Sequence, residues 1–337
     1  MVTVAGSPLS VLDLAPVSTG STVGQALRNS VDLARHVERL GYLRHWVAEH
    51  HNMPGIASSA PAVLIAHLAD ATTTLRVGSG GVMLPNHAPL VIAEQFGMLE
   101  ALHPGRIDLG IGRAPGTDQV TAWALRRNLD PSSEDLPTQL AELRAFFAGT
   151  YPRINAVPGR GNEPAIWLLG SSDFSARLAG ELGLPFSFAH HFMPQNTEPA
   201  LAIYRRSFRP SPALAEPYAM IGVAVVCAED DERARWLHEP SALGFLRLRS
   251  GRPSTLPSPE EAAAYEYDPA ERAFVDSWTA SHVVGSPSTV RDGLRELQAR
   301  TGADELMLTT MVHDHADRLR SYELVAEALA DDVSRAA

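Results

Sequence analysis

Short apolar segments recur along the chain, and several of them run directly into small or polar residues. Four clear examples end at residues 44–47, 75–77, 107–111 and 166–169. Helix-length stretches separate these segments, which is typical of buried parallel strands alternating with helices. A barrel built in this way gathers the carboxyl ends of its strands on one face, where its active site lies. The pattern therefore predicts a site that is spread over several strand ends.

The same alternation continues along the whole chain. Strands are expected near residues 9–14, 44–47, 75–79, 107–111, 165–169, 185–189, 218–227 and 304–310. Helices are expected from the Ser21-Thr22 cap to Gly41, and at residues 60–71, 89–102, 136–148, 173–182, 195–207 and from about 315. Eight strands are the number that closes a barrel. The fold class predicted is therefore α/β, a (β/α)8 TIM barrel that forms one domain over residues 1–337, with an insertion before the last strand.

The insertion is expected between Glu229 and Val284, a stretch that is too long for a single crossover. It is rich in proline, as in Leu256-Pro257-Ser258-Pro259, and its central part covers residues 240–280. Long loops before the last strand of a barrel often cover its mouth. A lid and an ordinary surface excursion are both open interpretations of this region.

Charge and composition exclude several classes of function. The 337-residue chain has a net charge of −11, which argues against a nucleic-acid groove or an anionic membrane surface. All 28 basic residues are arginine, so Schiff-base catalysis, a lysine base and a P-loop lysine are excluded. The single cysteine, Cys227, lies in an apolar run and is expected to be a buried thiol. Residues 1–14 lack a signal-peptide pattern and no run has the length of a membrane span, so we expect a cytoplasmic protein.

Candidate proton-transfer groups follow the second expected strand, where Glu49, His50 and His51 place a carboxylate and two imidazoles at the barrel mouth. Histidine titrates near neutral pH and is suited to general acid–base work. The competing interpretation is a histidine that only satisfies a backbone carbonyl. The position at a strand end favours a catalytic role for His50 and Glu49.

Glycine and serine turns follow three other expected strands. Gly78-Ser79-Gly80-Gly81 lacks the spacing of a dinucleotide fingerprint, but its missing side chains let a flat ring approach the main chain. A β-bulge at a barrel corner is compatible with that role. Arg113 and the turn at residues 170–175 offer a guanidinium, backbone N–H groups and hydroxyls to a single phosphate. The same Ser-Ser-Asp pattern also serves as an ordinary helix cap.

A metal site is the alternative that the histidine pairs raise. His50, His190 and His313 follow different strands and could in principle converge on a hydrolytic metal. The pairs differ in register and no strand end offers a bridging carboxylate. No metal is therefore expected.

These stretches resemble the bacterial luciferase-like family of flavin-dependent monooxygenases, in particular its single-chain bacterial members. The resemblance covers nearly the whole chain and is carried by residues 9–16, 48–52, 78–89, 94–96, 104–118, 167–172 and 284–287. It implies a βα barrel that holds FMN at its mouth. By position, it implies that a cis peptide at Gly80-Gly81 lies against the flavin ring, that Gly112 stands where luciferase has a cysteine, and that His50 is catalytic. Gly170, Arg113, Ser171, Ser172 and Ser175 match the phosphate site.

Two departures from the family pattern bear on how FMN is held. Residues 136–139 lack the arginine that many relatives carry there, and Ser171 replaces a glutamate of luciferase. Both changes favour weakly held FMN that arrives in reduced form from a separate flavin reductase. The implied reaction is a two-component oxygenation, in which reduced FMN and dioxygen form a peroxide at flavin carbon 4a that oxygenates a small organic substrate.

The resemblance also implies partners and alternatives. The substrate classes expected are aromatic polyketides and long-chain carbonyl compounds, and a homodimer is the expected assembly. A deazaflavin-dependent oxidoreductase of the same superfamily is the rival enzyme, and a flavin-binding protein without turnover is the rival of another class. The retained Glu49, His50 and eight expected strands argue for turnover.

Overall fold

The computed structural model describes residues 1–114, 118–125 and 136–336. Within these residues, eight parallel strands close a barrel: β2 (Ser7–Asp13), β3 (Arg44–Val47), β4 (Arg76–Met83), β5 (Ile107–Gly112), β6 (Ala165–Gly170), β7 (Phe186–Phe188), β8 (Ala219–Cys227) and β10 (Glu305–Thr309). The barrel closes because β2 pairs with β10 on one side and with β3 on the other. The predicted (β/α)8 TIM barrel is confirmed, and each expected strand is found within a few residues of its expected bounds. Part of the 104–118 motif, residues 115–117, lies outside the described residues.

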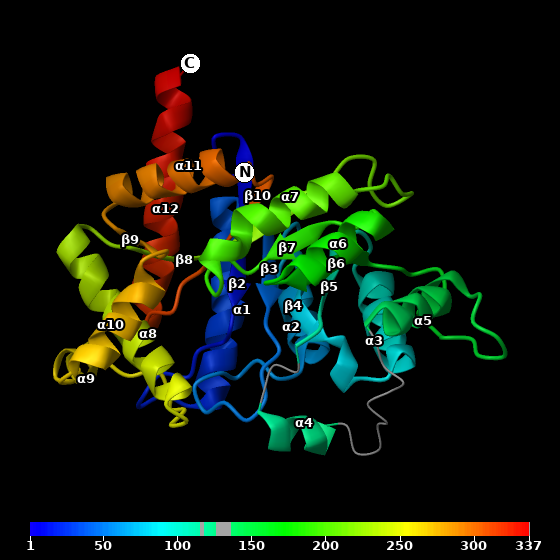
Figure 1. The fold of residues 1–337 in the computed structure, drawn as a ribbon, viewed down its shortest axis with the longest axis horizontal. Coiled ribbons are helices and arrows are strands. Elements are labelled where there is room, and N and C mark those ends of the chain that lie inside the picture. Colours follow the sequence, from blue (N-terminus) through cyan, green and yellow to red (C-terminus); the bar gives the residue numbers. More distant parts are fainter. Residues whose placement is uncertain (115–117, 126–135, 337) are drawn as a thin grey trace.

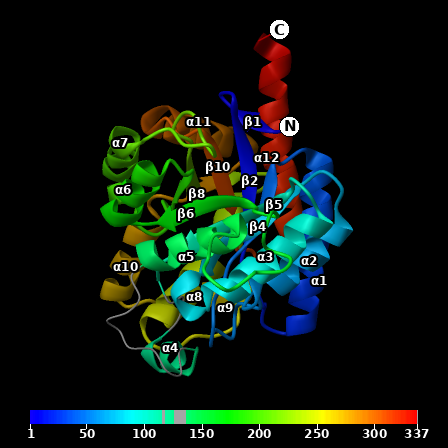
Figure 2. The ribbon, with the colours of Figure 1, turned by 90° about the vertical axis from the view of Figure 1, so that its right-hand side faces the viewer.

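Helices surround the barrel, as Figures 1 and 2 show. Those that follow the expected pattern are α1 (Val23–Leu40), α2 (Pro61–Ala71), α3 (Pro89–Leu102), α5 (Leu136–Ala148), α6 (Asp173–Leu182), α7 (Thr197–Ser207) and α12 (His315–Ala336). The cap signals operate as expected at α1, because Oγ1 of Thr22 accepts a hydrogen bond from the backbone N–H of Gln25. Gly41 then ends this helix with a left-handed φ of 85°.

The amino-terminal end of the barrel is closed by buried ion pairs. Arg44 donates to Glu305 at 2.7 Å and to Asp108 at 2.9 Å, and all three residues lie at or next to the first residue of their strands. Above them, Trp46 packs edge-on against Trp167, within an inner cluster that includes Met220 and Met307. Side chains therefore fill the amino-terminal part of the barrel interior, and a cavity can form only at the carboxyl-terminal ends of the strands.

The segment between Glu229 and Val284 contains helices that the sequence pattern did not predict. They are α8 (Asp231–Arg249), α9 (Pro259–Ala263) and α10 (Pro269–Thr279), and they are followed by β9 (Val283–Gly285) and α11 (Pro287–Thr301). Asp230 caps α8 through a side-chain bond to the N–H of Arg233, while Pro240 inside the helix obscures its helical pattern. A satellite apolar cluster joins α8 to α9 and α10 and includes Leu243, Leu246 and Val275.

Further additions lie at the two ends of the barrel. β1 (Thr3–Val4) forms an antiparallel pair with β2 at the amino-terminal end, and α4 (Gln119–Leu125) lies toward the other end. In both views α8 and α9 also lie toward the end opposite β1. Cys227 is a buried free thiol. None of the described helices is both long and apolar enough to cross a membrane.

Candidate active site

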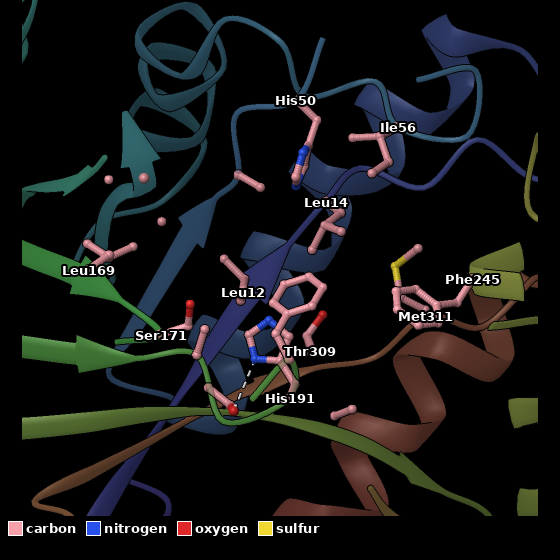
Figure 3. A pocket seen from close by; sticks show the side chains of 18 of the residues that line it. Leu12, Leu14, His50, Ile56, Leu169, Ser171, His191, Phe245, Thr309 and Met311 are labelled. Carbon is pink, nitrogen blue, oxygen red and sulfur yellow. Dashed lines mark hydrogen bonds between the residues drawn. The ribbon is translucent and has the colours of Figure 1, made fainter. Parts of the chain in front are cut away.

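A cavity of about 450 Å³ opens at the carboxyl-terminal end of the barrel (Figure 3). Its lining is mostly apolar and includes Leu12, Leu14, Ile56, Phe245 and Met311. The loop that carries Ile56 is tied to the barrel by a bridge to Pro16, and the segment that carries Leu256 is tied to Ser18. The cavity thus has a barrel floor and walls that come from distant parts of the chain.

Nine of the ten predicted catalytic and cofactor residues line this single cavity: His50, Gly80, Gly81, Gly112, Arg113, Gly170, Ser171, Ser172 and Ser175. Glu49 is the one predicted site residue that does not line it. The residues come from the ends of β3, β4, β5 and β6, as expected for a site spread over strand ends.

Gly80 and Gly81, at the end of β4, form part of the cavity floor. The Gly80–Gly81 peptide bond is cis, and the register with β5 shifts between Gly80 and Val82. A Cβ on Gly80 would lie 2.8 Å from Leu12 Cδ1, and one on Gly81 would lie 2.8 Å from the carbonyl oxygen of Gly110. Glycine is therefore required here by packing, and the main chain itself borders the cavity.

The turn between β6 and α6 has the geometry of an anion cradle. Ser172 is the N-cap of α6, yet its side chain makes no capping hydrogen bond, so the interpretation as an ordinary side-chain cap does not describe it. A Cβ on Gly170 would lie 2.5 Å from Cβ of Ser175, which shows how tightly the turn closes on the first helical turn. Backbone N–H groups at a helix start carry partial positive charge and bind phosphate readily.

Arg113 brings a cation to the same turn. Its guanidinium carbon lies 4.8 Å from the centre of the Phe174 ring, and Phe174 is the second residue of α6. The side chain is exposed, so its charge is available to a ligand at the cavity edge. Gly112, just before it, has no room for a side chain because a Cβ would lie 2.8 Å from Met83 Sδ. The cradle and the glycine floor therefore lie at neighbouring strand ends.

His50 and Glu49 occupy different environments although they are adjacent in the sequence. His50 lines the cavity, and its backbone N–H donates to the carbonyl of Ser58 at 3.0 Å. Glu49 is fully buried, where it accepts hydrogen bonds from the ring nitrogens of His51 and His87 and from the Met83 N–H. Burial alone raises the pKa of Glu49, but its hydrogen bonds to His87, His51 and Met83 outweigh burial and lower the pKa.

The other histidines do not form a metal site with His50. His190 is buried and bonds Oγ1 of Thr197 through Nδ1, and His313 lies near the carbonyl of Thr19. Neither lines the cavity. Among the residues that the structure describes, no group of three or more histidine, cysteine, aspartate or glutamate side chains is arranged to hold a metal ion.

Several cavity residues were not predicted from the sequence. They come from the strands and helices of the second half of the chain and include His191, His238, Phe245, Trp278, Thr309 and Met311. Phe245 stacks on Trp278 at 4.0 Å between ring centres, and Trp278 packs edge-on against His282. The only available signal was the pair His190-His191 after the β7 strand, because the helices that carry the aromatic residues were themselves not predicted.

Comparison with known proteins identifies the family. A family model described as luciferase-like monooxygenase matches residues 8–305. The chain belongs to the luciferase-like monooxygenase family. It is 54% identical over 322 residues to protein YvbT of Bacillus subtilis, covering 95% of this chain and 96% of that protein. It is 48% identical over 320 residues to a luciferase-like monooxygenase of Escherichia coli K12, covering 94% and 96% of the two chains.

Solved structures of the family have the same fold. The crystal structure of apo-MsnO8 superposes with a TM-score of 0.88 at 42% identity, covering 96% of this chain and 98% of that one. Two more distant structures share the fold alone. One is the oxygenating constituent of 3,6-diketocamphane monooxygenase from Pseudomonas putida in complex with FMN, with a TM-score of 0.71 at 20% identity and coverage of 97% and 98% of the two chains. The other is a coenzyme F420-dependent reductase from Methanopyrus kandleri, with a TM-score of 0.69 at 14% identity and coverage of 97% and 99%. The predicted family is confirmed. Membership supports an oxidoreductase, and relatives of this fold use either a flavin or a deazaflavin.

Proposed function

We propose that the chain is the oxygenating component of a two-component flavin-dependent monooxygenase. It would take reduced FMN from a separate flavin reductase and use dioxygen to oxygenate a small organic substrate. The observation that carries this proposal is one cavity that joins an anion cradle, a glycine floor and an apolar body. A phosphate-bearing planar cofactor and an apolar substrate require these three features together.

The residues present fit FMN at the level of charge and shape. Arg113 and the turn at residues 170–175 would hold the phosphate, because both supply N–H donors at the same edge of the cavity. Gly80 and Gly81 would border the ring system, since no side chain separates their main chain from the cavity. When bound, reduced FMN supplies the electrons that activate dioxygen.

His50 is proposed as the group that moves a proton in this cavity. Val47 pairs with Ser79, so the segment that leads to His50 runs beside the segment that leads to Gly80 and Gly81. An imidazole at this position can hold a proton on either ring nitrogen next to the cofactor floor. Glu49 would act differently from the catalytic role expected for it. It would be a positioning residue that ties the ends of β3 and β4 together through Met83 and His87.

The apolar wall would keep water from the reacting atoms. Phe245 on α8 and Trp278 on α10 line the cavity, and both belong to the 240–280 region that interrupts the barrel. Excluding water strengthens electrostatic interactions within the site and prevents loss of reactive species. We therefore propose that this region covers the cavity as part of a single domain over residues 1–337.

A homodimer is the proposed assembly. Four large apolar side chains are exposed on the neighbouring helices α2 and α3, namely Val63, Val91, Met98 and Leu102. Leu102 is 67% exposed and Val63 is 63% exposed. A shared apolar face on two packed helices supports association with a second copy of the chain.

The test of the proposed function is reductase-coupled turnover. Full-length protein, FMN, a flavin reductase and a nicotinamide donor are incubated under oxygen with a panel of aromatic and long-chain carbonyl compounds. Oxygenated product that contains label from 18O2 supports the proposal. Hydrogen peroxide as the only product across the panel would favour a flavin-binding protein without turnover.

A further inference from the structure

The side of the cavity opposite the glycine floor carries polar groups that the proposed cofactor site does not use. Around the closed barrel β8 is four strands from β4 in either direction, so Gly222 on β8 faces Gly80 and Gly81 across the mouth. His191 and Thr309 lie on this far side and line the cavity, among residues that are mostly apolar. Figure 3 shows both side chains beside each other, across the cavity from His50.

The His191 ring is held in one orientation by Gly222. Its Nδ1 donates to the Gly222 carbonyl oxygen at 3.0 Å, and the backbone N–H of His191 donates to the same oxygen at 2.9 Å. The ring also occupies the space of a missing side chain, because a Cβ on Gly222 would lie 2.7 Å from Nδ1. A carbonyl only accepts, so Nδ1 carries the hydrogen and Nε2 of the neutral ring is an acceptor.

The neutral form of His191 is strongly favoured at ordinary pH. Burial lowers its pKa to about 4, and although the bond to the Gly222 carbonyl raises the pKa, nearby His50 lowers it further. The ring thus offers one acceptor nitrogen, on the side away from the dashed bond in Figure 3.

Thr309 provides the complementary polar atom. The residue is 7% exposed, and among the described residues its Oγ1 has no hydrogen-bond partner. The strand register pairs Met307 with Gly222 and Thr309 with Ala224, so Thr309 lies one strand across and two residues further along than Gly222. A buried hydroxyl without a partner costs free energy, so in a cavity such a group is available to a bound ligand or a water molecule.

We propose that His191 and Thr309 bind a hydroxyl group of the substrate. The hydroxyl donates to Nε2 of His191 and accepts from Oγ1 of Thr309, a pairing that a carbonyl or an ether oxygen cannot make because it has no hydrogen to donate. The adjoining wall includes Phe245, stacked on Trp278, which suits a planar apolar body. The substrate class assigned is therefore a hydroxyarene, and this assignment rests on the proposed monooxygenase function.

The test compares two probes that differ by one methyl group, 2-naphthol and 2-methoxynaphthalene. Equilibrium dialysis of each probe against the full chain measures both dissociation constants, with and without FMN. We expect 2-naphthol to bind about 5- to 150-fold more tightly, the range for leaving the buried Nε2 acceptor of His191 without a partner when the ether binds. His191→Phe should reduce this ratio toward one by weakening 2-naphthol binding and leaving the ether nearly unchanged. Thr309→Val should weaken both probes, because an ether oxygen also accepts a hydrogen bond from a hydroxyl.

Conservative and control variants separate a specific contact from a general loss of structure. Thr309→Ser keeps the hydroxyl and should retain the affinity of both probes, and His191→Gln should retain part of the ratio through its amide oxygen. Gly222→Ala should lower the ratio by displacing the His191 ring. Ser241→Ala, which alters another cavity-lining side chain on α8, should leave the ratio unchanged.

Several results would overturn the inference: equal binding of the two probes to the unaltered protein, no measurable binding of either, an unchanged ratio in His191→Phe, or unchanged binding of both probes in Thr309→Val. FMN titration of each variant reports whether its fold and cofactor site remain intact. A ratio of one with normal FMN binding and turnover would refute only the hydroxyarene assignment. A retained ratio without oxygenated product would refute only the proposed function.

Discussion

Replacing Arg113 by alanine tests the phosphate cradle at its most accessible group. Arg113 is exposed, and its guanidinium lies 4.8 Å from the centre of the Phe174 ring at the start of α6. The substitution removes a cation and its donors from the cavity edge. It removes no buried contact on which the barrel depends, so we expect the variant to fold normally.

The size of the effect follows from the kind of contact that is lost. A hydrogen bond to a charged group contributes about 1.5 to 3 kcal/mol. Because Arg113 is exposed, water screens part of its charge, and we expect a value near the lower end. A loss of about 1.5 kcal/mol weakens FMN binding roughly tenfold.

The assay is fluorescence titration of FMN and of riboflavin, which has the same ring system without the phosphate. Arg113→Ala should weaken FMN and leave riboflavin unchanged. Arg177→Ala removes the same charge from an exposed position on α6 that does not line the cavity, and it should change neither affinity beyond a small screened effect. Unchanged FMN affinity in Arg113→Ala, or an equal loss for riboflavin, would exclude Arg113 from the cradle.

Three further predictions concern catalysis, acid stability and assembly. His50→Ala should reduce coupled product formation by ~10²–10⁴-fold while FMN affinity changes little, and full activity would make His50 a packing residue. Because the pKa of Glu49 lies below its usual 4.5, its contribution to stability is present above that pH and is lost as the pH falls through its lower folded value. Glu49→Gln should therefore flatten the acid side of a plot of unfolding temperature against pH, and an unchanged slope would contradict the buried network. Leu102→Glu on α3 should shift the protein from dimer to monomer in sedimentation analysis. The control Val157→Glu, at an exposed apolar residue outside α2 and α3, should remain a dimer, and equal mass for both variants would contradict the proposed face.

The barrel could be predicted because its strands are buried on both faces. Ile107–Gly112 is buried at every residue, and apart from the ion-paired Asp108 the strand is an apolar and glycine run that is followed directly by Arg113. The glycine and serine turns were visible for the same reason, since each directly follows such a strand. α8 was missed because Pro240 lies inside it and polar residues surround its capping signal at Asp230.

The division of roles between neighbouring residues could not be predicted. Glu49 and His50 are adjacent, but the strand end directs Glu49 toward His87 and Met83 and leaves His50 on the cavity. Thr309 lies beside Ala224, two residues beyond Gly222, only because β10 pairs with β8 in a particular register, across a long separation in the sequence. Side-chain direction at strand ends and register between distant strands both depend on packing that a single sequence does not reveal.

Anaerobic titration with reduced FMN and with the deazaflavin coenzyme F420 tests the central claim most directly. Both coenzymes are offered to the full chain under the same conditions, and binding is followed by equilibrium dialysis. The account predicts that reduced FMN binds more tightly, and that Arg113→Ala weakens it. Tighter binding of the deazaflavin, or no binding of reduced FMN, would contradict the assignment of this cavity to a flavin-dependent monooxygenase.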